Sequence, residues 1–124
     1  MIRGYEVKKV IVFTLDTLRR DVLGSYGNDN GLTHFFDSIQ DKCIRFTKCQ
    51  AVESCTQASF PGIPNSSYCL DHGKTPRPQL SSKRALISEL VKSAGIYAAA
   101  FNSNHYLSGH FGWDRGWQQF YDSM

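Results

Sequence analysis

The sequence predicts an α/β fold in which a parallel sheet alternates with helices. Two apolar runs, 10–15 and 96–101, are typical of strands buried on both faces of a parallel sheet. The segment 86–94, just before the second run, repeats apolar residues at the spacing of a helix. Strands that alternate with helices in this way are typical of layered α/β architectures.

Composition and charge narrow the function classes. The chain has 124 residues, of which 41% are hydrophobic and 20% charged, which suits one compact globular domain. Its 14 Lys and Arg and 11 Asp and Glu are scattered, so we expect no nucleic-acid partner. The longest apolar run is far short of the roughly 20 residues that span a bilayer, and the N-terminus lacks the apolar core of a signal peptide. We therefore predict a soluble, cytoplasmic protein without a membrane partner.

The four cysteines are predicted to be free thiols. They form no C-x-x-C pair, and the spacing of Cys43, Cys49, Cys55 and Cys69 matches no zinc-binding pattern. A zinc or redox protein built on these cysteines is therefore the least favoured hypothesis.

The first half of the chain is predicted to contain a strand, a short helix and a second extended segment. The strand 10–15 ends at Asp16, and a polar loop covers 24–31. Thr33 can then cap a short helix, after which 43–47 is extended. The apolar face of this helix consists of Phe35, Phe36 and Ile39.

The second half is predicted to be mainly helical before the strand 96–101. A turn at 53–59 leads into a helix that starts near Phe60, and 64–78 is rich in proline and forms a surface loop. Ser81 or Ser82 caps the clearest helix, and Gly95 ends it. The apolar stripe of that helix is Leu86, Ile87, Leu90, Val91 and Ala94, with Ser88, Glu89 and Lys92 opposite.

The C-terminal segment 111–121 is dense in aromatic residues, and no later element would cover them. We expect an exposed apolar patch made of Trp113, Trp117, Phe120 and Tyr121. A missing C-terminal half or a second copy in a homo-oligomer would cover it, so the chain is expected to be incomplete.

Asp16 is the candidate metal ligand. It follows the first predicted strand at its carboxyl end, where open α/β sheets place functional groups, and a carboxylate there can bind a hard cation. The alternative is an acid that caps a helix or belongs to a loop. Asp21 is expected to cap a helix or to pair with a nearby arginine.

Thr56 and His105 are the candidate catalytic residues. Thr56 lies near a predicted helix start, where backbone N–H groups can hold an oxyanion beside its hydroxyl, and the alternative is an ordinary N-cap. Cys55 could be the reactive group instead, and is otherwise expected to be a buried, inert thiol. His105 follows the second strand among polar residues and can bind an oxyanion or donate a proton, or is simply a solvated histidine.

The order of these motifs resembles the N-terminal part of the sulfatases, a branch of the alkaline phosphatase superfamily. Segments 10–21 and 23–27 resemble the family's opening strand, metal-binding acid and LGxYG turn, and 56–63 corresponds to its nucleophile motif. The resemblance is collinear over nearly all of 8–122, with further matching segments at 33–37, 44–47, 70–73, 94–97 and 111–117.

The resemblance implies an alkaline-phosphatase-like layered fold, of which residues 1–124 form the N-terminal portion. A partial parallel sheet with flanking helices would run through 10–15, 44–47 and 96–101. The family takes further metal ligands from later sequence. We therefore expect weak metal binding and little turnover from this chain alone.

The resemblance also implies hydrolysis of a small-molecule sulfate or phosphate ester. Asp16 and Thr56 would bind a divalent metal ion (Ca, Mg, Mn or Zn), Thr56 would attack sulfur or phosphorus, and His105 would contact the transferred group or leaving oxygen. Ala58 and Phe60 replace the Pro and Arg of the C/S-x-P-x-R motif, so formylglycine is not expected.

Other departures from the sulfatase pattern favour two further possibilities. An unmodified threonine nucleophile resembles the phosphatase and phosphoglycerol-transferase relatives, and Ser103 replaces a family lysine that would neutralise a sulfate ester. The alternative function, of a different class, is a truncated, catalytically inactive fragment or an interaction module that lacks the C-terminal metal ligands.

Overall fold

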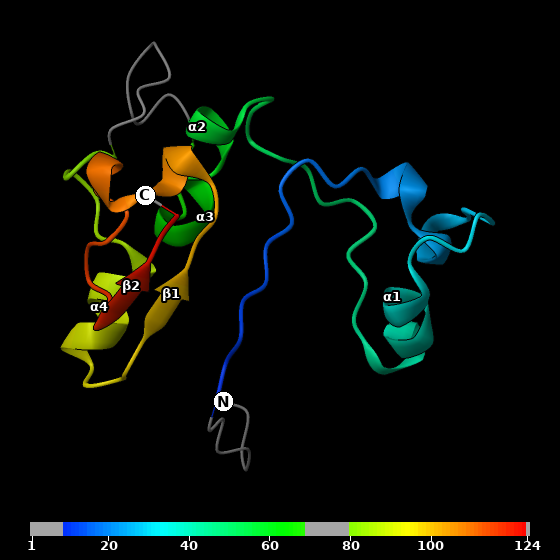
Figure 1. The fold of residues 1–124 in the computed structure, drawn as a ribbon, viewed down its shortest axis with the longest axis horizontal. Coiled ribbons are helices and arrows are strands. Elements are labelled where there is room, and N and C mark those ends of the chain that lie inside the picture. Colours follow the sequence, from blue (N-terminus) through cyan, green and yellow to red (C-terminus); the bar gives the residue numbers. More distant parts are fainter. Residues whose placement is uncertain (1–8, 69–79, 124) are drawn as a thin grey trace. The chain divides into compact units, whose positions relative to one another are not determined.

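In the computed structural model, which describes residues 9–68 and 80–123, the chain forms two compact units, Met1–Lys48 and Cys49–Met124 (Figure 1). Short helices and one two-stranded parallel sheet give it a mixed α/β structure, as the sequence predicts. Cys69, the segment 70–73 and most of the predicted loop 64–78 lie outside the described residues. In the described ranges no helix is long and apolar enough to cross a membrane.

The first unit contains α1 (His34–Ile39) and the 3-10 helices η1 (Arg20–Val22), η2 (Gly24–Tyr26) and η3 (Gln40–Lys42). The predicted helix after Thr33 is confirmed, and Thr33 is its N-cap residue. No hydrophobic side chain is buried among the described residues of this unit. Polar contacts therefore contribute most of what holds it together.

The two strands predicted in the first unit, 10–15 and 44–47, are not formed. Both segments lack regular structure and are exposed, with Ile11 at 88% and Ile44 at 86%. β-branched residues favour an extended backbone, but a strand also needs a neighbour that completes its backbone hydrogen bonds. Within the described part of the chain, neither segment has such a neighbour.

The second unit contains α2 (Thr56–Ser59), α3 (Gly62–Asn65), α4 (Ile87–Ser93), β1 (Ala99–Phe101) and β2 (Gln119–Tyr121). The strands pair in parallel, with Ala100 opposite Phe120 (Figure 1). The prediction of a strand at 96–101 is confirmed for its last three residues, which form β1. Its partner β2 comes from the aromatic C-terminal segment, for which the sequence predicts no strand.

The helices around Phe60 differ from the prediction. The first helix begins at Thr56 rather than near Phe60, and Phe60 is the residue at its C-terminal cap. A second helix, α3, then takes in Pro64 and Asn65, which were expected to begin a loop. Pro64 is tolerated because it lies in the first turn of α3, where a backbone N–H has no hydrogen-bond partner within the helix.

The second unit has a small hydrophobic core, which covers most of the aromatic residues that the sequence predicts to form an exposed patch. Its buried members are Leu80, Leu86, Leu107 and Trp113, with Phe60, Phe111 and Phe120 packed against them. Trp113 is only 8% exposed, and its ring meets that of Phe60 edge-on at 5.5 Å between centroids. Tyr121 stays 51% exposed and stacks on Phe101. Most of the aromatic residues are therefore covered by their own unit.

The predicted apolar stripe of α4 is confirmed only in part: Leu86 is buried at 1% exposure and Val91 is half-buried, but other positions differ. Ile87 and Leu90, on the predicted apolar stripe, are 50% and 54% exposed, whereas Ser88 is 1% exposed. The Ser88 hydroxyl donates a hydrogen bond of 2.8 Å to the backbone oxygen of Arg115. The N-cap is Leu86 rather than Ser81 or Ser82, and the predicted stop at Gly95 is confirmed by its left-handed backbone, with φ +74°.

Candidate functional site

Thr56 is the first residue of α2. Cys55 is the N-cap, with extended backbone angles of φ −129° and ψ 154°, so the interpretation of Thr56 as an ordinary N-cap is wrong. Thr56 is half-buried, and Ala58 anchors the helix to its unit with 4% exposure. Cys55 is an exposed thiol, not the buried one expected.

His105 begins the 3-10 helix η5 (His105–Leu107) and is exposed. Two asparagines build the loop before it. The Asn104 backbone N–H donates to Oδ1 of Asn102 at 3.0 Å, and Nδ2 of Asn102 donates to the Asn104 backbone oxygen at 2.9 Å. Asn104 also caps η5, because its Oδ1 accepts from the Tyr106 N–H at 3.0 Å.

Aromatic neighbours orient the His105 ring. The ring of Phe111 lies edge-on to it at 5.4 Å between centroids and 86°, and the ring of Tyr106 lies at 5.7 Å and 69°. Leu107, two residues later, is buried in the core and anchors the turn. An imidazole held in this way on an exposed turn is accessible to an anionic ligand.

The structure brings the elements of Thr56 and His105 together. Within the second unit, α2 packs against η5, so the helix that begins with Thr56 adjoins the turn that begins with His105. Sequence position alone gives no hint that α2 and η5 are neighbours, because the two elements lie far apart in the chain.

Asp16 belongs to the first unit and lies in an exposed turn. The Thr17 hydroxyl donates to its Oδ1 at 3.4 Å. Thr17 has a φ of +63°, which is a strained, left-handed conformation for a β-branched residue. Since Asp16 and Thr56 belong to separate units, their joint binding of a cation stays a prediction. In the described ranges, no three His, Cys, Asp or Glu residues form a group that could hold a metal.

Asp21 pairs with Arg19, as one of the two predictions for it proposed. Nε of Arg19 donates to its Oδ1 at 2.9 Å, and a second, shorter bond joins Nη2 to Oδ2. The hydrogen bonds from Arg19 lower the pKa of the Asp21 carboxyl, and the same bonds raise the pKa of Arg19. Asp21 is therefore committed to a local ion pair.

The LGxYG-like turn is held by the helix start that follows it. The Gly24 N–H donates to Oγ1 of Thr33 at 2.9 Å, and the Ser25 N–H donates to Oδ1 of Asp37 at 2.9 Å. The Thr33 hydroxyl in turn donates to Oδ2 of Asp37 at 3.1 Å. A Cβ at position 24 would overlap the Asp37 carboxylate, which explains the glycine.

Tyr26 links this turn to the segment 44–47. The guanidinium carbons of Arg20 and Arg45 lie 5.5 and 5.3 Å from the centre of its ring. Its hydroxyl donates to the Phe46 backbone oxygen at 3.1 Å. Arg45 also donates to the Ser25 backbone oxygen. Three motifs that the sequence shows separately therefore meet at Tyr26.

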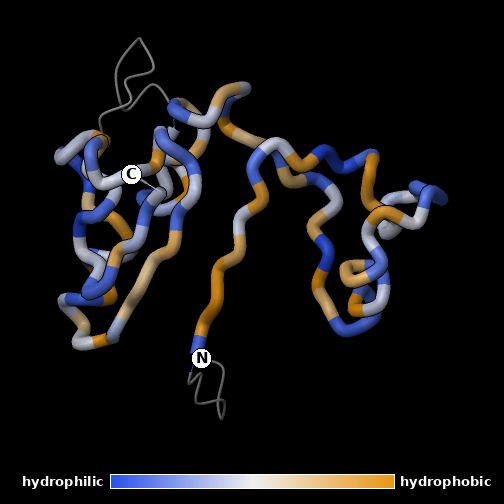
Figure 2. The backbone as a smooth tube through the Cα atoms, viewed as in Figure 1, coloured by the Kyte–Doolittle hydropathy of each residue, from blue (hydrophilic) through white to orange (hydrophobic). Residues whose placement is uncertain are grey.

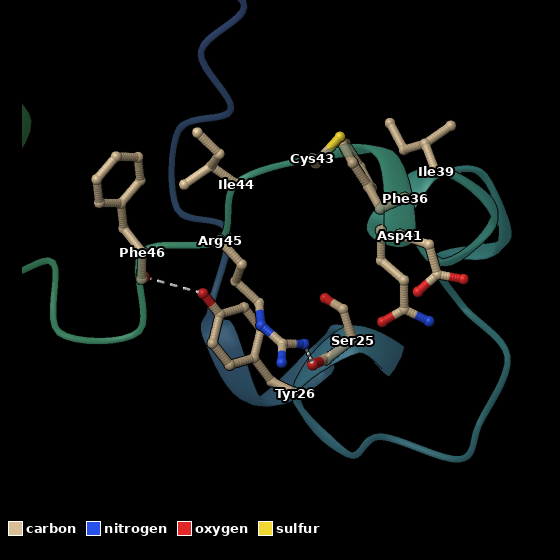
Figure 3. A pocket seen from close by; sticks show the side chains of 10 residues that line it. Ser25, Tyr26, Phe36, Ile39, Asp41, Cys43, Ile44, Arg45 and Phe46 are labelled. Carbon is tan, nitrogen blue, oxygen red and sulfur yellow. Dashed lines mark hydrogen bonds between the residues drawn. The ribbon is translucent and has the colours of Figure 1, made fainter.

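A pocket of about 440 Å³ lies beside this network (Figure 3). Its walls combine the Arg45 guanidinium with apolar side chains from α1 and the segment after it. It is lined by Ser25, Tyr26, Phe36, Ile39, Gln40, Asp41, Cys43, Ile44, Arg45 and Phe46. It contains none of the candidate residues Asp16, Thr56 and His105, and Arg45 is already engaged with Ser25 and Tyr26.

Arg115 joins several segments of the second unit, as Tyr26 does in the first unit. Its guanidinium donates to Oε2 of Glu89 at 2.8 Å, to the Ser81 backbone oxygen at 2.9 Å and to the Arg84 backbone oxygen at 3.1 Å. Glu89 also accepts from the Leu86 N–H at 2.8 Å. The hydrogen bond from Arg115, followed by that from Leu86, lowers the pKa of the Glu89 carboxyl.

The chain matches no known family model, no curated protein and no solved structure. The resemblance to the sulfatases therefore rests on the sequence motifs.

Proposed function

We propose that this chain carries the nucleophile of a metal-assisted hydrolase that cleaves sulfate or phosphate esters, with an N-terminal region similar to that of the sulfatases. The packing of α2 on η5 carries the proposal, because it makes Thr56 and His105 residues of adjoining elements. Ester cleavage by covalent catalysis needs a nucleophile and a proton donor within reach of one substrate, and residues on adjoining elements can meet this need.

In the proposed reaction the Thr56 hydroxyl oxygen attacks the sulfur or phosphorus and loses its proton to solvent. A new bond forms to that oxygen while the bond to the leaving oxygen breaks, and His105 supplies the leaving oxygen with a proton. Water then hydrolyses the threonine ester, which releases sulfate or phosphate and restores the hydroxyl. His105 regains from solvent the proton that it donated.

Asp16 and Thr56 would hold the divalent cation through a carboxylate and a hydroxyl oxygen, donors that suit hard cations. When bound, such a cation lowers the pKa of the hydroxyl and offsets charge on the ester oxygens. The strained backbone of Thr17 supports a functional role for this turn, because such strain is concentrated at functional sites.

Trapping the covalent intermediate tests the proposal even if turnover is slow. The full chain would be incubated with 4-nitrophenyl phosphate or 4-nitrophenyl sulfate and Mg²⁺, Mn²⁺, Ca²⁺ or Zn²⁺, quenched in acid and analysed by peptide mass spectrometry. We expect one phosphoryl or sulfuryl group on Thr56, its retention in Thr56→Ser and its loss in Thr56→Val. An adduct on Cys55, or one that survives Thr56→Val, would contradict the proposal.

The role of His105 has a separate test. A 4-nitrophenolate leaves without protonation, whereas an alkoxide needs a proton, so His105→Ala should slow alkyl esters by about 100-fold or more and aryl esters much less. His110→Ala is the matched control, because His110 is also exposed and also contacts Phe111. Equal losses for both ester types would rule out proton donation by His105.

A binding module without catalysis is the second candidate. It is supported by exposed apolar side chains near β1, where Ile96, Tyr97 and Phe101 are 55%, 63% and 79% exposed. Binding of a hydrophobic dye by a chain that forms no adduct on Thr56 would favour this function. A chain that forms the adduct and binds no dye would exclude it.

A further inference from the structure

The segment 9–15 is extended and exposed, and Asp16 begins the turn that follows it. The segment runs from Lys9 up to Asp16 through uncharged residues, as a drawn-out and mostly hydrophobic trace (Figure 2). Its hydrophobic side chains are largely open to solvent, with exposures of 76% for Val10, 88% for Ile11, 76% for Val12 and 77% for Phe13. The backbone groups of 10–15 form no hydrogen bond with any other described residue.

These features are those of a strand that lacks a neighbour. The run contains β-branched and aromatic residues, no charge, no proline and no glycine between its ends. An unpaired backbone row with such side chains is a template for pairing with another chain. An identical segment from a second copy offers the same β propensity and the same unused donors and acceptors.

The charges at the two ends select one register. In an antiparallel pair with Val12 opposite Phe13 of the second copy, Val10 lies opposite Leu15 and Ile11 opposite Thr14. The same register places Lys9 opposite Asp16, and two-fold symmetry repeats this contact at the other end. Opposite charges directly across an antiparallel pair stabilise it, and like charges destabilise it.

A parallel, in-register pair has the reverse electrostatics. It would place Lys9 opposite Lys9 and Asp16 opposite Asp16, so that both ends repel. The charge pattern therefore favours the antiparallel arrangement over the parallel one, although both would cover the same apolar side chains.

We propose that the segment 9–16 is a self-association strand, which pairs antiparallel with the same segment of a second copy in the register set by Lys9 and Asp16. This inference does not rest on the proposed ester hydrolysis, although both assign a role to Asp16. A single strand pair is a small interface, so the dimer should be weak, with a dissociation constant on the order of 10 μM.

Sedimentation equilibrium of the full chain tests the inference, in EDTA so that no cation competes for Asp16. We expect a monomer–dimer equilibrium for the wild-type protein. Lys9→Glu and Asp16→Lys should each weaken dimerisation by about tenfold, because both ends of the pair then carry like charges. The double variant Lys9→Glu with Asp16→Lys should restore a dissociation constant close to that of the wild type.

Two further variants separate strand pairing from other apolar contacts. Val12→Pro should abolish the dimer, because proline removes a backbone donor from the pair. Lys83→Glu is the matched control for charge, since Lys83 is exposed and lies outside the segment, and it should leave the dimer intact. A purely monomeric wild type, a dimer that survives Val12→Pro, or a double variant no stronger than the single ones would each overturn the inference.

Discussion

Tyr26 shows how a single side chain can join several segments that carry no buried apolar core. Two guanidinium groups lie near its ring, and its hydroxyl donates to the backbone oxygen of Phe46. A tyrosine in an LGxYG-like turn is visible in the sequence, but its two arginine partners are not, because Arg20 and Arg45 are distant in sequence from each other. Sequence reasoning could have found this centre only by asking which cations the ring would attract.

The two parts of Tyr26 should contribute unequally. Tyr26→Phe removes one partly solvated hydrogen bond and should cost about 0.5 kcal/mol, whereas Tyr26→Ala also removes both ring contacts and should cost about 1–2 kcal/mol. Urea denaturation followed by signals from the first unit measures both values. Tyr97→Ala is the control, because Tyr97 is 63% exposed. Identical losses for Phe and Ala would show that the ring contacts add nothing.

Glu89 should make the second unit less stable in acid. Its folded pKa is lowered by Arg115, so the stabilisation is fully present above the unfolded pKa of 4.5 and is lost as the pH falls through the folded pKa. The side chains of Arg115 and Glu89 are 25% and 36% exposed, which limits the contribution to about 1 kcal/mol. Glu89→Gln should therefore reduce the free energy of unfolding at about pH 6–7 and have much less effect at about pH 3.

The control for this pH dependence is Glu53→Gln. Glu53 is exposed and accepts only a local hydrogen bond from the Ser54 N–H. Its substitution should give a small, nearly constant change across the same range. A Glu89→Gln effect that grows towards acid pH would contradict the assigned direction of the pKa change.

Among the elements, α4 shows what sequence patterns can predict about a helix and what they cannot. Its existence and its end at Gly95 follow from helical spacing and from a glycine stop. Its orientation follows only in part, because Ser88 is buried through a hydrogen bond to Arg115 and through the close approach of Gly116, which no periodicity reveals. The prediction of a strand at 10–15 is wrong for a related reason. The run has strand-like residues, but strand pairing depends on a partner elsewhere in the chain.

Gly116 should be far less replaceable than Gly95. Both have left-handed backbones, with φ of +81° and +74°, so alanine costs about 1 kcal/mol of conformational strain at either site. A Cβ at 116 would in addition overlap the backbone of Glu89, whereas one at 95 meets nothing within 4 Å. Gly116→Ala should therefore cost about 3 kcal/mol or more. Equal melting temperatures for the two variants would show that α4 does not pack closely on this loop.

At the scale of the whole molecule, the two units differ in the interactions that stabilise each of them internally. The buried hydrophobic residues of the described chain, Ala58, Leu80, Leu86, Leu107 and Trp113, all belong to the second unit. The first unit depends on hydrogen bonds, ion pairs and cation–π contacts at its surface. A sequence with a near-average hydrophobic fraction gives no warning of this division, because total composition does not say which apolar residues find partners.

Amide hydrogen exchange should reveal this division directly. Local stability is low where few apolar contacts are buried, so amides of α1 should exchange at least tenfold faster than those of α4 and β1. Mass-resolved exchange on the intact chain measures both sets at once. Comparable protection in the two sets would mean that the polar network of the first unit is as stabilising as the hydrophobic core.

The sequence suggests the candidate residues, which stay a prediction, but not the contacts that surround them. The positions of Asp16, Thr56 and His105 near the ends of predicted elements drew attention to them, and the sulfatase resemblance assigned their roles. The packing of α2 on η5 and the asparagine loop before His105 needed coordinates, because they depend on contacts between residues far apart or on backbone geometry.

The central proposal, which the structure does not test, is that Asp16 and Thr56 bind one divalent cation together. Paramagnetic broadening by Mn²⁺ in the amide spectrum of the full chain tests it most directly, with Asp16→Asn as the variant that should lose the effect and Asp29→Asn, an exposed loop acid, as its control. We predict that substoichiometric Mn²⁺ broadens the signals of both Asp16 and Thr56, and that Asp16→Asn removes both effects. Broadening at only one of the two residues, or broadening at Thr56 that persists in Asp16→Asn, would contradict the claim.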